Sequence, residues 1–313
     1  MYSGASNFSS PVDDAFMFIL IISVIFFVGI TFAMIYFVIR YHHTRNKVVA
    51  NIHGNFTLEL LWTVIPTLLV LGMFYYGFIG YRDMKTIPEN ALEIKTTGRM
   101  WSWLYRYENG FETDTLMVPL GKPVNIQIES ADVLHSLYIP AFRVKQDAIP
   151  GMTTFLWFEA TQTGVYDIFC AEYCGDRHTY MLSSVKVLPV EEYDAWYAAT
   201  AEFAKAPGSV AGAPSKPGSR GPMLYKVKGC IACHSTDGTR LIGPTFKGIY
   251  GKEESVITGG QERQIIVDEE YLRRSVRQPD ADKVKGFESV PMPPQALTDE
   301  ELEELVAWIK ELK

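Results

Sequence analysis

Two long stretches without charged side chains dominate the first quarter of the chain. Residues 15–39 and 60–81 contain no Asp, Glu, Lys or Arg. At about 1.5 Å per residue, each stretch is long enough as a helix to cross a hydrocarbon core of about 30 Å. The pattern predicts a transmembrane hairpin over residues 1–84 that is anchored in a lipid bilayer, with helices at about 15–40 and 56–82. Two core helices of a soluble protein are the alternative.

Charged residues beside these stretches predict the orientation of the hairpin. Arg40, Arg45 and Lys47 lie in the connecting loop, which contains no acidic residue, whereas Asp13 and Asp14 precede the first helix. Basic loops favour the cytoplasmic side of a membrane. We therefore expect both chain ends, and everything after the second helix, on the periplasmic or outer side.

The rest of the chain divides at a segment rich in small residues, Pro and Gly. This segment, residues 205–222, cannot bury a core and is typical of a linker. Before it, residues 85–204 contain short runs of alternating apolar and polar residues, for example at Val124, Ile126 and Ile128. Such runs, bounded by Gly, Pro and Asp, predict a β-sandwich.

Residues 223–313 carry helical signals instead. Thr298 and Glu301 have the spacing of a capping box, and they precede an apolar stripe at helical spacing. We expect this domain to be small and mostly α-helical.

Composition excludes several classes of protein. With 48% apolar residues, 21% charged residues and four cysteines, the chain is not collagenous, disordered or disulfide-dense. Acidic residues outnumber Lys and Arg by 36 to 29, and no basic stripe with interleaved aromatics is present in the sequence. Nucleic acid is therefore not an expected partner.

The second pair of cysteines predicts a covalently bound haem. Cys230, Cys233 and His234 form the CxxCH pattern, in which two thiols attach haem c and the imidazole binds its iron. Met292, in a proline-rich segment, is the predicted second axial ligand, because a Met/His pair favours electron transfer over binding of substrates. A chance motif with a redox-active disulfide is the alternative.

The first pair of cysteines predicts copper. Cys170, Cys174, His178 and Met181 lie close together in the sequence, and His135 precedes them. Thiolates, imidazoles and a thioether favour copper over magnesium or calcium. The extra cysteine indicates two metal ions that share bridging thiolates, with the thioether and a backbone carbonyl as weak outer ligands. A structural zinc site and a plain disulfide remain alternatives.

At these residues the sequence resembles subunit II of the haem-copper cytochrome c oxidases, in the caa3-type form with a fused C-terminal cytochrome c. The resemblance covers nearly the whole chain. It implies a cupredoxin-like Greek-key β-sandwich for residues 85–204 and an all-α class I cytochrome c domain for residues 223–313. It also implies electron transfer from haem c to a binuclear CuA centre and on to subunit I, where oxygen is reduced to water and protons are pumped. The implied location is a bacterial plasma membrane.

The resemblance further implies roles for single residues. The Glu172 backbone carbonyl would bind copper, and its side chain would bind magnesium at the boundary with subunit I. Trp101 would be the point at which electrons enter the copper centre. The Pro244 carbonyl would accept a hydrogen bond from the haem histidine, and Glu59 would lie at the entrance of a proton channel shared with subunit I.

The partners implied are subunit I, subunit III and, as electron donor, an upstream cytochrome c or a quinol-oxidising complex. Two other functions are alternatives. CuA domains also serve nitric oxide and nitrous oxide reductases, and a membrane-tethered copper carrier would need similar ligands. The two-helix anchor favours the oxidase, and a carrier would give no reason for a haem domain.

Overall fold

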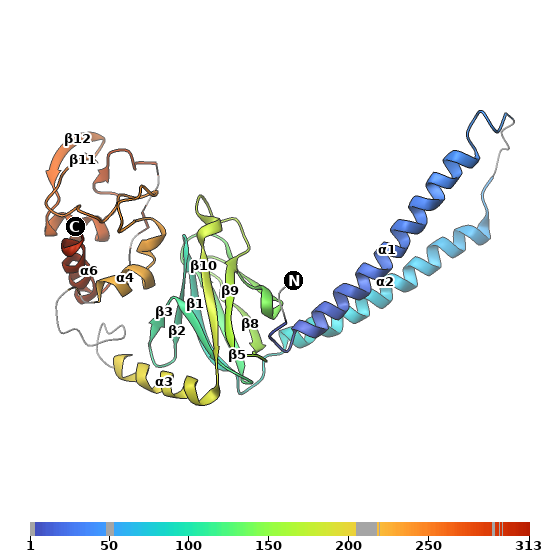
Figure 1. The fold of residues 1–313 in the computed structure, drawn as a ribbon, viewed down its shortest axis with the longest axis horizontal. Helices are drawn as coiled ribbons and strands as arrows, with labels where there is room; N and C mark the ends of the chain where they lie inside the picture. The colour runs from blue at the N-terminus through green and yellow to red at the C-terminus, as the bar shows by residue number, and fades with distance from the viewer. Residues whose placement is uncertain are drawn as a thin grey trace.

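The structure is a computed structural model that describes residues 4–47, 53–204, 218, 220–289, 292, 293, 295 and 297–313. The chain forms a long helical hairpin, a two-sheet domain and a smaller C-terminal domain, in that order (Figure 1). Most of the predicted linker, residues 205–222, lies outside the described residues. Its last two residues, Gly221 and Pro222, belong instead to helix α4 (Gly221–Val227), because proline is well suited to the first turn of a helix.

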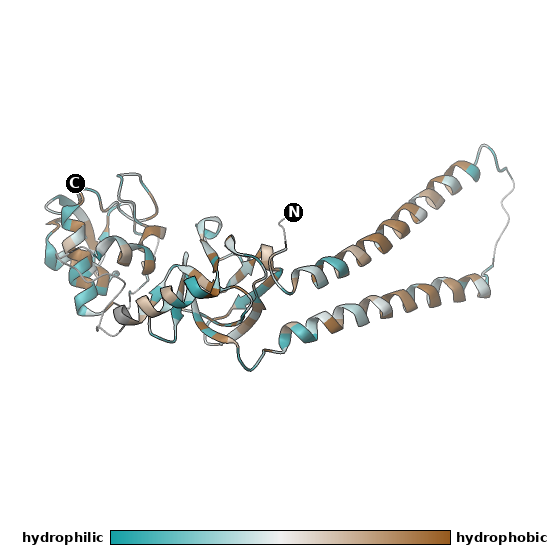
Figure 2. Ribbon diagram, turned by 60° about the horizontal axis from the view of Figure 1, so that its bottom comes forward, coloured by the Kyte–Doolittle hydropathy of each residue, from teal (hydrophilic) through white to brown (hydrophobic). Residues whose placement is uncertain are grey.

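The hairpin consists of α1 (Ser9–Arg40) and α2 (Phe56–Lys85). Both helices extend beyond the charge-free stretches and are long and apolar enough to cross a membrane. Hydrophobic residues cover them along most of their length (Figure 2), and no residue of their apolar windows is buried. Such apolar surface needs lipid or another protein around it.

The hairpin is attached to the two-sheet domain through residues at its ends. The Ser6 hydroxyl donates to the Phe142 carbonyl at 2.7 Å, and the Trp157 indole donates to the Asp83 carbonyl at 3.2 Å. The rings of Phe8 and Trp157 meet edge to face at 4.8 Å. The sandwich therefore lies at the end of both helices that is opposite their connecting loop (Figure 1).

The central domain is a β-sandwich of two five-stranded sheets, as the alternating pattern predicts. The first sheet has the order β3-β2-β1-β5-β8, and the second has the order β4-β10-β9-β6-β7. β1 pairs with β5 and β4 pairs with β10 in parallel, and the other pairs are antiparallel. The strands are β1 (Leu92–Arg99), β2 (Ser102–Tyr107), β3 (Glu112–Thr113), β4 (Thr115–Pro119), β5 (Pro123–Ser130), β6 (His135–Ile139), β7 (Val144–Ala148), β8 (Thr154–Glu159), β9 (Gly164–Cys170) and β10 (Leu182–Leu188).

The core of the sandwich lies between the two sheets. Val124, Ile126 and Ile128 of β5 are fully buried, and so are Trp103 and Tyr105 of β2. Short helices η1 (Pro140–Phe142) and η2 (His178–Tyr180) connect strands, and α3 (Val190–Ala204) follows the last one. The core does not depend on the cysteines for most of its packing.

The C-terminal domain is mainly helical, but it also contains a small sheet that the all-α expectation did not include. Its elements are α4, η3 (Cys230–Ala232), β11 (Glu253–Thr258), β12 (Gln261–Ile266), α5 (Glu269–Arg277), β13 (Lys283–Val284) and α6 (Asp299–Glu311). The strands form a sheet of order β12-β11-β13. A Gly259–Gly260 pair with positive φ at both residues connects β11 and β12, which is a strong hairpin signal.

Helices α4 and α6 pack closely against each other. A Cβ atom at Gly221 would lie 2.0 Å from Cβ of Trp308, so only glycine permits this approach. The predicted capping box is present, because the Thr298 side chain accepts from the Glu301 N–H and the Glu301 carboxylate accepts from the Thr298 N–H. This cap fixes the start of α6, whose apolar face forms the core of the domain.

Candidate metal centre and haem site

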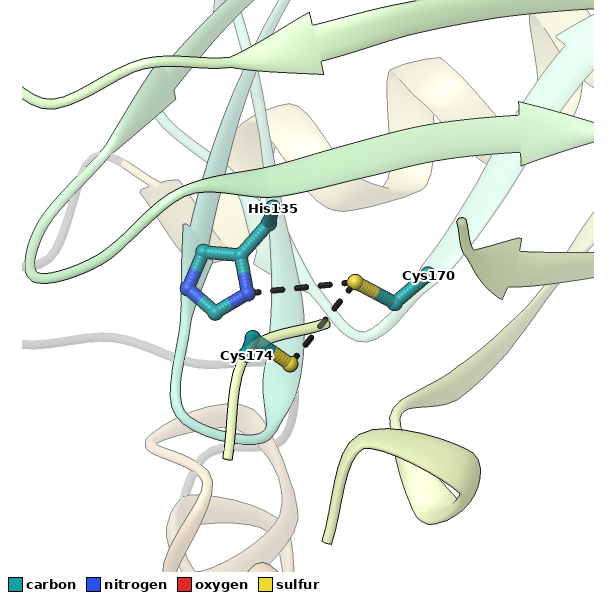
Figure 3. A group of neighbouring side chains, drawn as sticks. All are labelled: His135, Cys170 and Cys174. Atoms are coloured by element: carbon teal, nitrogen blue, oxygen red, sulfur yellow. Dashed lines mark hydrogen bonds between the residues drawn. The ribbon is translucent and has the colours of Figure 1, made fainter. Parts of the chain in front are cut away.

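A cluster of soft donor side chains lies at one end of the sandwich. His135 is the first residue of β6, Cys170 is the last residue of β9, and Cys174 and Met181 lie on the segment between β9 and β10. Figure 3 shows His135, Cys170 and Cys174 directed toward one another. All four side chains are buried, so the fold itself holds them in place.

The donor atoms of this cluster are within bridging distance of one another. The two Sγ atoms of Cys170 and Cys174 are 3.8 Å apart. Cys170 Sγ lies 3.9 Å from His135 Nδ1 and 3.2 Å from the Glu172 carbonyl oxygen. Cys174 Sγ lies 3.5 Å from Nδ1 of His178 and 3.8 Å from Sδ of Met181. The structure thus brings together every residue that the sequence predicts for the copper site.

This donor set fits copper better than the alternatives. The four cysteines are free in the structure, and a separation of 3.8 Å between two sulfurs is far from a disulfide bond of about 2.05 Å. A thioether donor has no role in a structural zinc site, whereas thiolate, imidazole and thioether donors together suit copper. Two thiolates at this spacing, each beside a different histidine, can hold two ions between them.

Ionisation of the two thiols is unequal. Burial opposes ionisation of Cys170, but hydrogen bonds from the His135 ring and nearby backbone lower its pKa to about 6. Burial, together with the charge on Cys170, raises the pKa of Cys174 to about 12. Without a cation between them, Cys174 is therefore the harder of the two thiols to ionise. Metal binding supplies the positive charge that a second thiolate needs.

Asp132 fixes the orientation of the His135 ring. Its carboxylate lies 2.7 Å from His135 Nε2, which leaves Nδ1 facing Cys170. The backbone N–H groups of Met100 and Val133 donate to the same carboxylate at 2.7 Å. Burial raises the pKa of Asp132, but these hydrogen bonds outweigh it and hold the pKa below its usual value. Sequence reasoning did not identify Asp132, although an acid three residues before a ligand histidine is a usable signal.

Trp101 lies against the same cluster. Its indole N–H donates to the Cys174 carbonyl at 3.0 Å, and the side chain is buried. Gly175 lies beneath the ring: it has a φ of +110°, and a Cβ atom there would be 3.2 Å from Trp101 Cζ2. The predicted electron entrance is therefore in direct hydrogen-bond contact with the backbone of a predicted copper ligand.

The C-terminal domain contains a cavity that fits haem. Cys233, His234 and Met292 line it together with apolar side chains, and its empty space is about 930 Å³ including the open mouth. The Pro244 carbonyl lies 2.7 Å from Nδ1 of His234, which leaves Nε2 free to bind iron. Burial lowers the pKa of His234, which favours the neutral ring that an iron ligand requires.

Two further details support attachment of haem at this cavity. A Cβ atom at Gly243 would lie 2.7 Å from Cε1 of His234, so the histidine ring occupies space that only glycine leaves open. Cys230 and Cys233 are not joined to each other, so both thiols are free to attach haem. Gly243 is a second functional position that the sequence analysis did not identify.

Glu59 does not join either site. It lies in the first turn of α2, is exposed, and is separated from the sandwich by the length of the hairpin (Figure 1).

Known proteins match the chain along nearly its whole length. Residues 1–78 match the transmembrane domain of cytochrome c oxidase subunit II, residues 109–188 match its periplasmic domain, and residues 218–313 match cytochrome c. Cytochrome c oxidase subunit 2 of Alkalihalophilus pseudofirmus is 32% identical over 308 residues, covering 94% of this chain and 86% of that protein. The corresponding subunit of Cereibacter sphaeroides is 34% identical over 223 residues, covering 58% and 73%.

A solved structure is also similar in sequence. The periplasmic domain of subunit II of cytochrome oxidase from Bradyrhizobium japonicum is 36% identical, with a TM-score of 0.36, and the match covers 37% of this chain and 97% of that one.

An apolar helical hairpin, a sandwich with a copper-type donor set and a mainly helical domain with a haem cavity define a membrane-anchored electron-transfer protein. Its cofactors are copper and haem c, and its β-domain is periplasmic. The chain belongs to the cytochrome c oxidase subunit II family, in a form with a fused cytochrome c domain. Its function is electron transfer within a haem-copper oxidase, where subunit I is its partner.

Proposed function

We propose that the cluster at the end of the sandwich is a binuclear CuA centre. The supporting observation is the pair of thiols 3.8 Å apart, each with its own histidine within 3.9 Å. The ligand set is His135, Cys170, Cys174, His178 and Met181, with the Glu172 backbone carbonyl. His135 and Cys170 lie at strand ends and are buried together with Cys174 and Met181, so these donors can hold their positions in both oxidation states with little rearrangement.

Haem c would be held in the cavity of the C-terminal domain. Cys230 and Cys233 would attach it. His234 and Met292, which line the same cavity, would bind its iron. The Pro244 carbonyl would keep the proton of His234 on Nδ1. When bound, haem c and the copper centre supply one-electron redox chemistry.

The chain's own residues would then set the route between the two centres. Trp101 fills the space beside Cys174 and donates to its carbonyl, so it excludes water there and offers a conjugated ring next to a copper ligand. Its position supports the role as the point where electrons enter the copper centre. The main contribution of the protein to this electron transfer would be to hold Trp101 and the two cofactors in fixed positions.

Further roles belong to the interface with other subunits. Glu172 would bind magnesium at the boundary with subunit I through its side chain, while its carbonyl faces Cys170. Glu59 would lie at the entrance of a proton channel shared with subunit I. Subunit III would complete the assembly, and an upstream cytochrome c or quinol-oxidising complex would donate electrons.

The proposed division of the chain follows these roles. A membrane hairpin would comprise residues 1–84, the copper domain residues 85–204, the linker residues 205–222 and the haem domain residues 223–313. Arg40, with other basic residues of the hairpin loop, supports a cytoplasmic loop and both chain ends on the periplasmic side of a bacterial plasma membrane.

The dicopper assignment is tested on the purified complex by metal analysis, EPR and visible spectra. Two copper ions per chain with a shared-electron EPR signal are expected. His178→Ala should abolish that signal and oxidase turnover, whereas the exposed neighbour variant Thr179→Ala should keep both. One copper per chain with a blue-copper spectrum, or intact haem c without copper, would overturn the assignment.

A further inference from the structure

The haem domain contacts the copper domain through a defined polar face. The Arg99 guanidinium donates to the Val227 carbonyl at 2.8 Å. The Lys228 ammonium lies 3.3 Å from the Glu112 carboxylate of β3. A Cβ atom at Gly229 would lie 2.4 Å from the Ser102 hydroxyl, which shows how closely the two backbones approach.

Lys228 is buried at this face and has two carboxylate partners. Its side chain is 9% exposed, and it lies 2.9 Å from Glu301 of its own domain as well as 3.3 Å from Glu112 of the copper domain. Glu112 is also paired with Arg106. The side chains thus form a row of alternating charges that crosses the interface once, in the order Arg106, Glu112, Lys228 and Glu301. The pairing across the interface would be lost in any other relative placement of the domains.

An apolar contact lies beside these charges. Ala232, between the two haem-attaching cysteines, is buried against the core of the copper domain, and Cys233 packs on the same cluster. Cys233 also lines a small cavity together with Met100 and Trp101. The haem-attachment segment therefore meets the copper domain at the residue proposed as the electron entrance.

We propose that Lys228 is a positioning residue that latches the haem domain onto the Trp101 face of the copper domain. A buried, hydrogen-bonded charge contributes more to the specificity of docking than to its strength, because a misplaced domain would bury that charge without a partner. Apolar contact around Ala232 supplies the attraction between the two domains, and Lys228 and Arg99 fix their relative position. The inference deepens the proposed function, and rests on it, since the latched face contains Trp101.

The latch is tested in the intact oxidase with a thiol probe at Ser102. The chain has four cysteines, all of them proposed ligands or haem attachments, so Ser102→Cys introduces one further thiol, which Gly229 covers while the two domains are docked. Labelling at residue 102 is followed by mass spectrometry in this background, and the parent chain gives the baseline. Adding Lys228→Gln removes the cation between the carboxylates Glu112 and Glu301, although Arg106 still pairs with Glu112. We expect labelling to accelerate about tenfold or more, equivalent to about 1.4 kcal/mol in the docking equilibrium.

Three comparison variants sharpen the test. Glu112→Gln removes only the partner on the copper domain and should accelerate labelling less than Lys228→Gln, because Glu301 still pairs with Lys228. Lys226→Gln changes an exposed lysine in the last turn of α4, two residues before Lys228, and should have no effect. Arg106→Gln removes the exposed neighbour of Glu112 and should have little effect.

A second readout separates this inference from the proposed function. Electron transfer from haem c to copper, started by a flash, should slow about as much as labelling accelerates, while the haem and copper spectra stay unchanged. Faster labelling with unchanged electron transfer would support the latch and contradict the proposed route through Trp101. Unchanged labelling in both Lys228→Gln and Glu112→Gln, with intact spectra, would overturn the latch. If Lys228→Gln fails to assemble, Glu112→Gln alone decides the question.

Discussion

The copper domain and the haem domain hold their cofactors in opposite ways. In the copper domain the chain itself brings the donor atoms together, so that His135, Cys170 and Cys174 have ligand atoms within 4.8 Å of one another. In the haem domain, core residues instead line an open cavity in which haem c would be held. The copper ions would be a small addition to a core that is already complete, whereas haem c would itself form a large part of the core of its domain.

The lining of the haem cavity shows why this matters. Phe246, Ile249, Tyr271 and Leu272 are core residues of the haem domain and also cavity wall. Side chains that face empty space lack dispersion contacts on that side, and the loss grows with cavity volume. The core residues of the sandwich, such as Phe158, pack on other side chains instead. We therefore expect the haem domain, but not the copper domain, to depend on its cofactor for stability.

The largest expected effect comes from removing the haem attachment. In the double variant Cys230→Ala, Cys233→Ala we expect complete loss of covalent haem and unfolding of the haem domain, while the copper domain keeps its EPR signal. Visible spectra, haem staining and EPR of the same preparation measure the two outcomes together. Simultaneous loss of the copper signal would break the comparison, because it would show that the two domains fold as one unit.

Removing a copper ligand should have the converse outcome. In Cys174→Ser we expect loss of the dicopper signal and at least about a hundredfold loss of oxidase turnover, with the haem c spectrum intact. The melting temperature of the copper domain should fall only modestly, because Cys174 is at the edge of the core. Thermal unfolding followed by tryptophan fluorescence checks this, since Trp101 and Trp103 lie in that domain. A collapse of the sandwich would contradict the contrast between the two sites.

Local patterns in the sequence predicted much of this architecture. Alternation at Val124, Ile126 and Ile128 predicted one buried strand of the sandwich, and the spacing of Thr298 and Glu301 predicted the start of α6. The donor residues were identified because ligand chemistry restricts the residue types, whatever their distance in the chain. Such signals are contained in a few neighbouring side chains.

Contacts between distant segments were not predictable in the same way. Lys228 and Glu112 are 116 positions apart, and their pairing depends on how two finished domains meet. The contact between Asp132 and His135 depends on the conformation of the turn before β6. The Gly259–Gly260 turn is a local signal for a hairpin that the prediction of a mostly helical domain did not use. Tertiary placement, rather than residue chemistry, is what the sequence left open.

Asp132 offers a third test of the preassembled copper site. Asp132→Ala removes the acceptor that orients His135, and partners of this kind typically contribute about 10- to 100-fold to metal affinity. We expect copper retention against a chelator to fall by about that factor, with haem c unaffected. Asp167→Ala, an exposed acid on the same strand as Cys170, is the matched control. Equal retention in both variants would show that the sandwich positions His135 without help.

Two glycines allow the same substitution to be compared in both domains. A Cβ atom at Gly98 would lie 2.8 Å from Trp103 Cζ3 and 3.3 Å from the His135 ring, and one at Gly243 would lie 2.7 Å from the His234 ring. Gly98→Ala and Gly243→Ala should each cost about 1–3 kcal/mol through overpacking. Domain unfolding in denaturant measures both. We expect Gly98→Ala to change the copper signal and Gly243→Ala to change the haem spectrum, and crossed effects would contradict separate sites.

The smallest expected effect is a pH dependence confined to the haem domain. Asp282 is 3% exposed and pairs with Arg263 at 2.8 Å and with Arg274. Burial raises the pKa of Asp282, but hydrogen bonds from Arg263, Thr258 and Arg274 outweigh it and lower the pKa below its ordinary value of 3.8.

Because the folded pKa of Asp282 is the lower one, its contribution to stability is fully present above about pH 4 and is lost as the pH falls through the folded value. Both arginines are partly exposed, so the contribution is about 1 kcal/mol. Asp282→Asn should therefore destabilise the haem domain by that amount at pH 6, with the difference from the parent chain shrinking toward pH 3. Soret absorbance during unfolding follows this domain alone. If the difference in stability between Asp282→Asn and the parent chain stays constant over this pH range, Asp282 acts through packing and not through its charge. The haem domain would then resemble the core of the sandwich, which is held by packing.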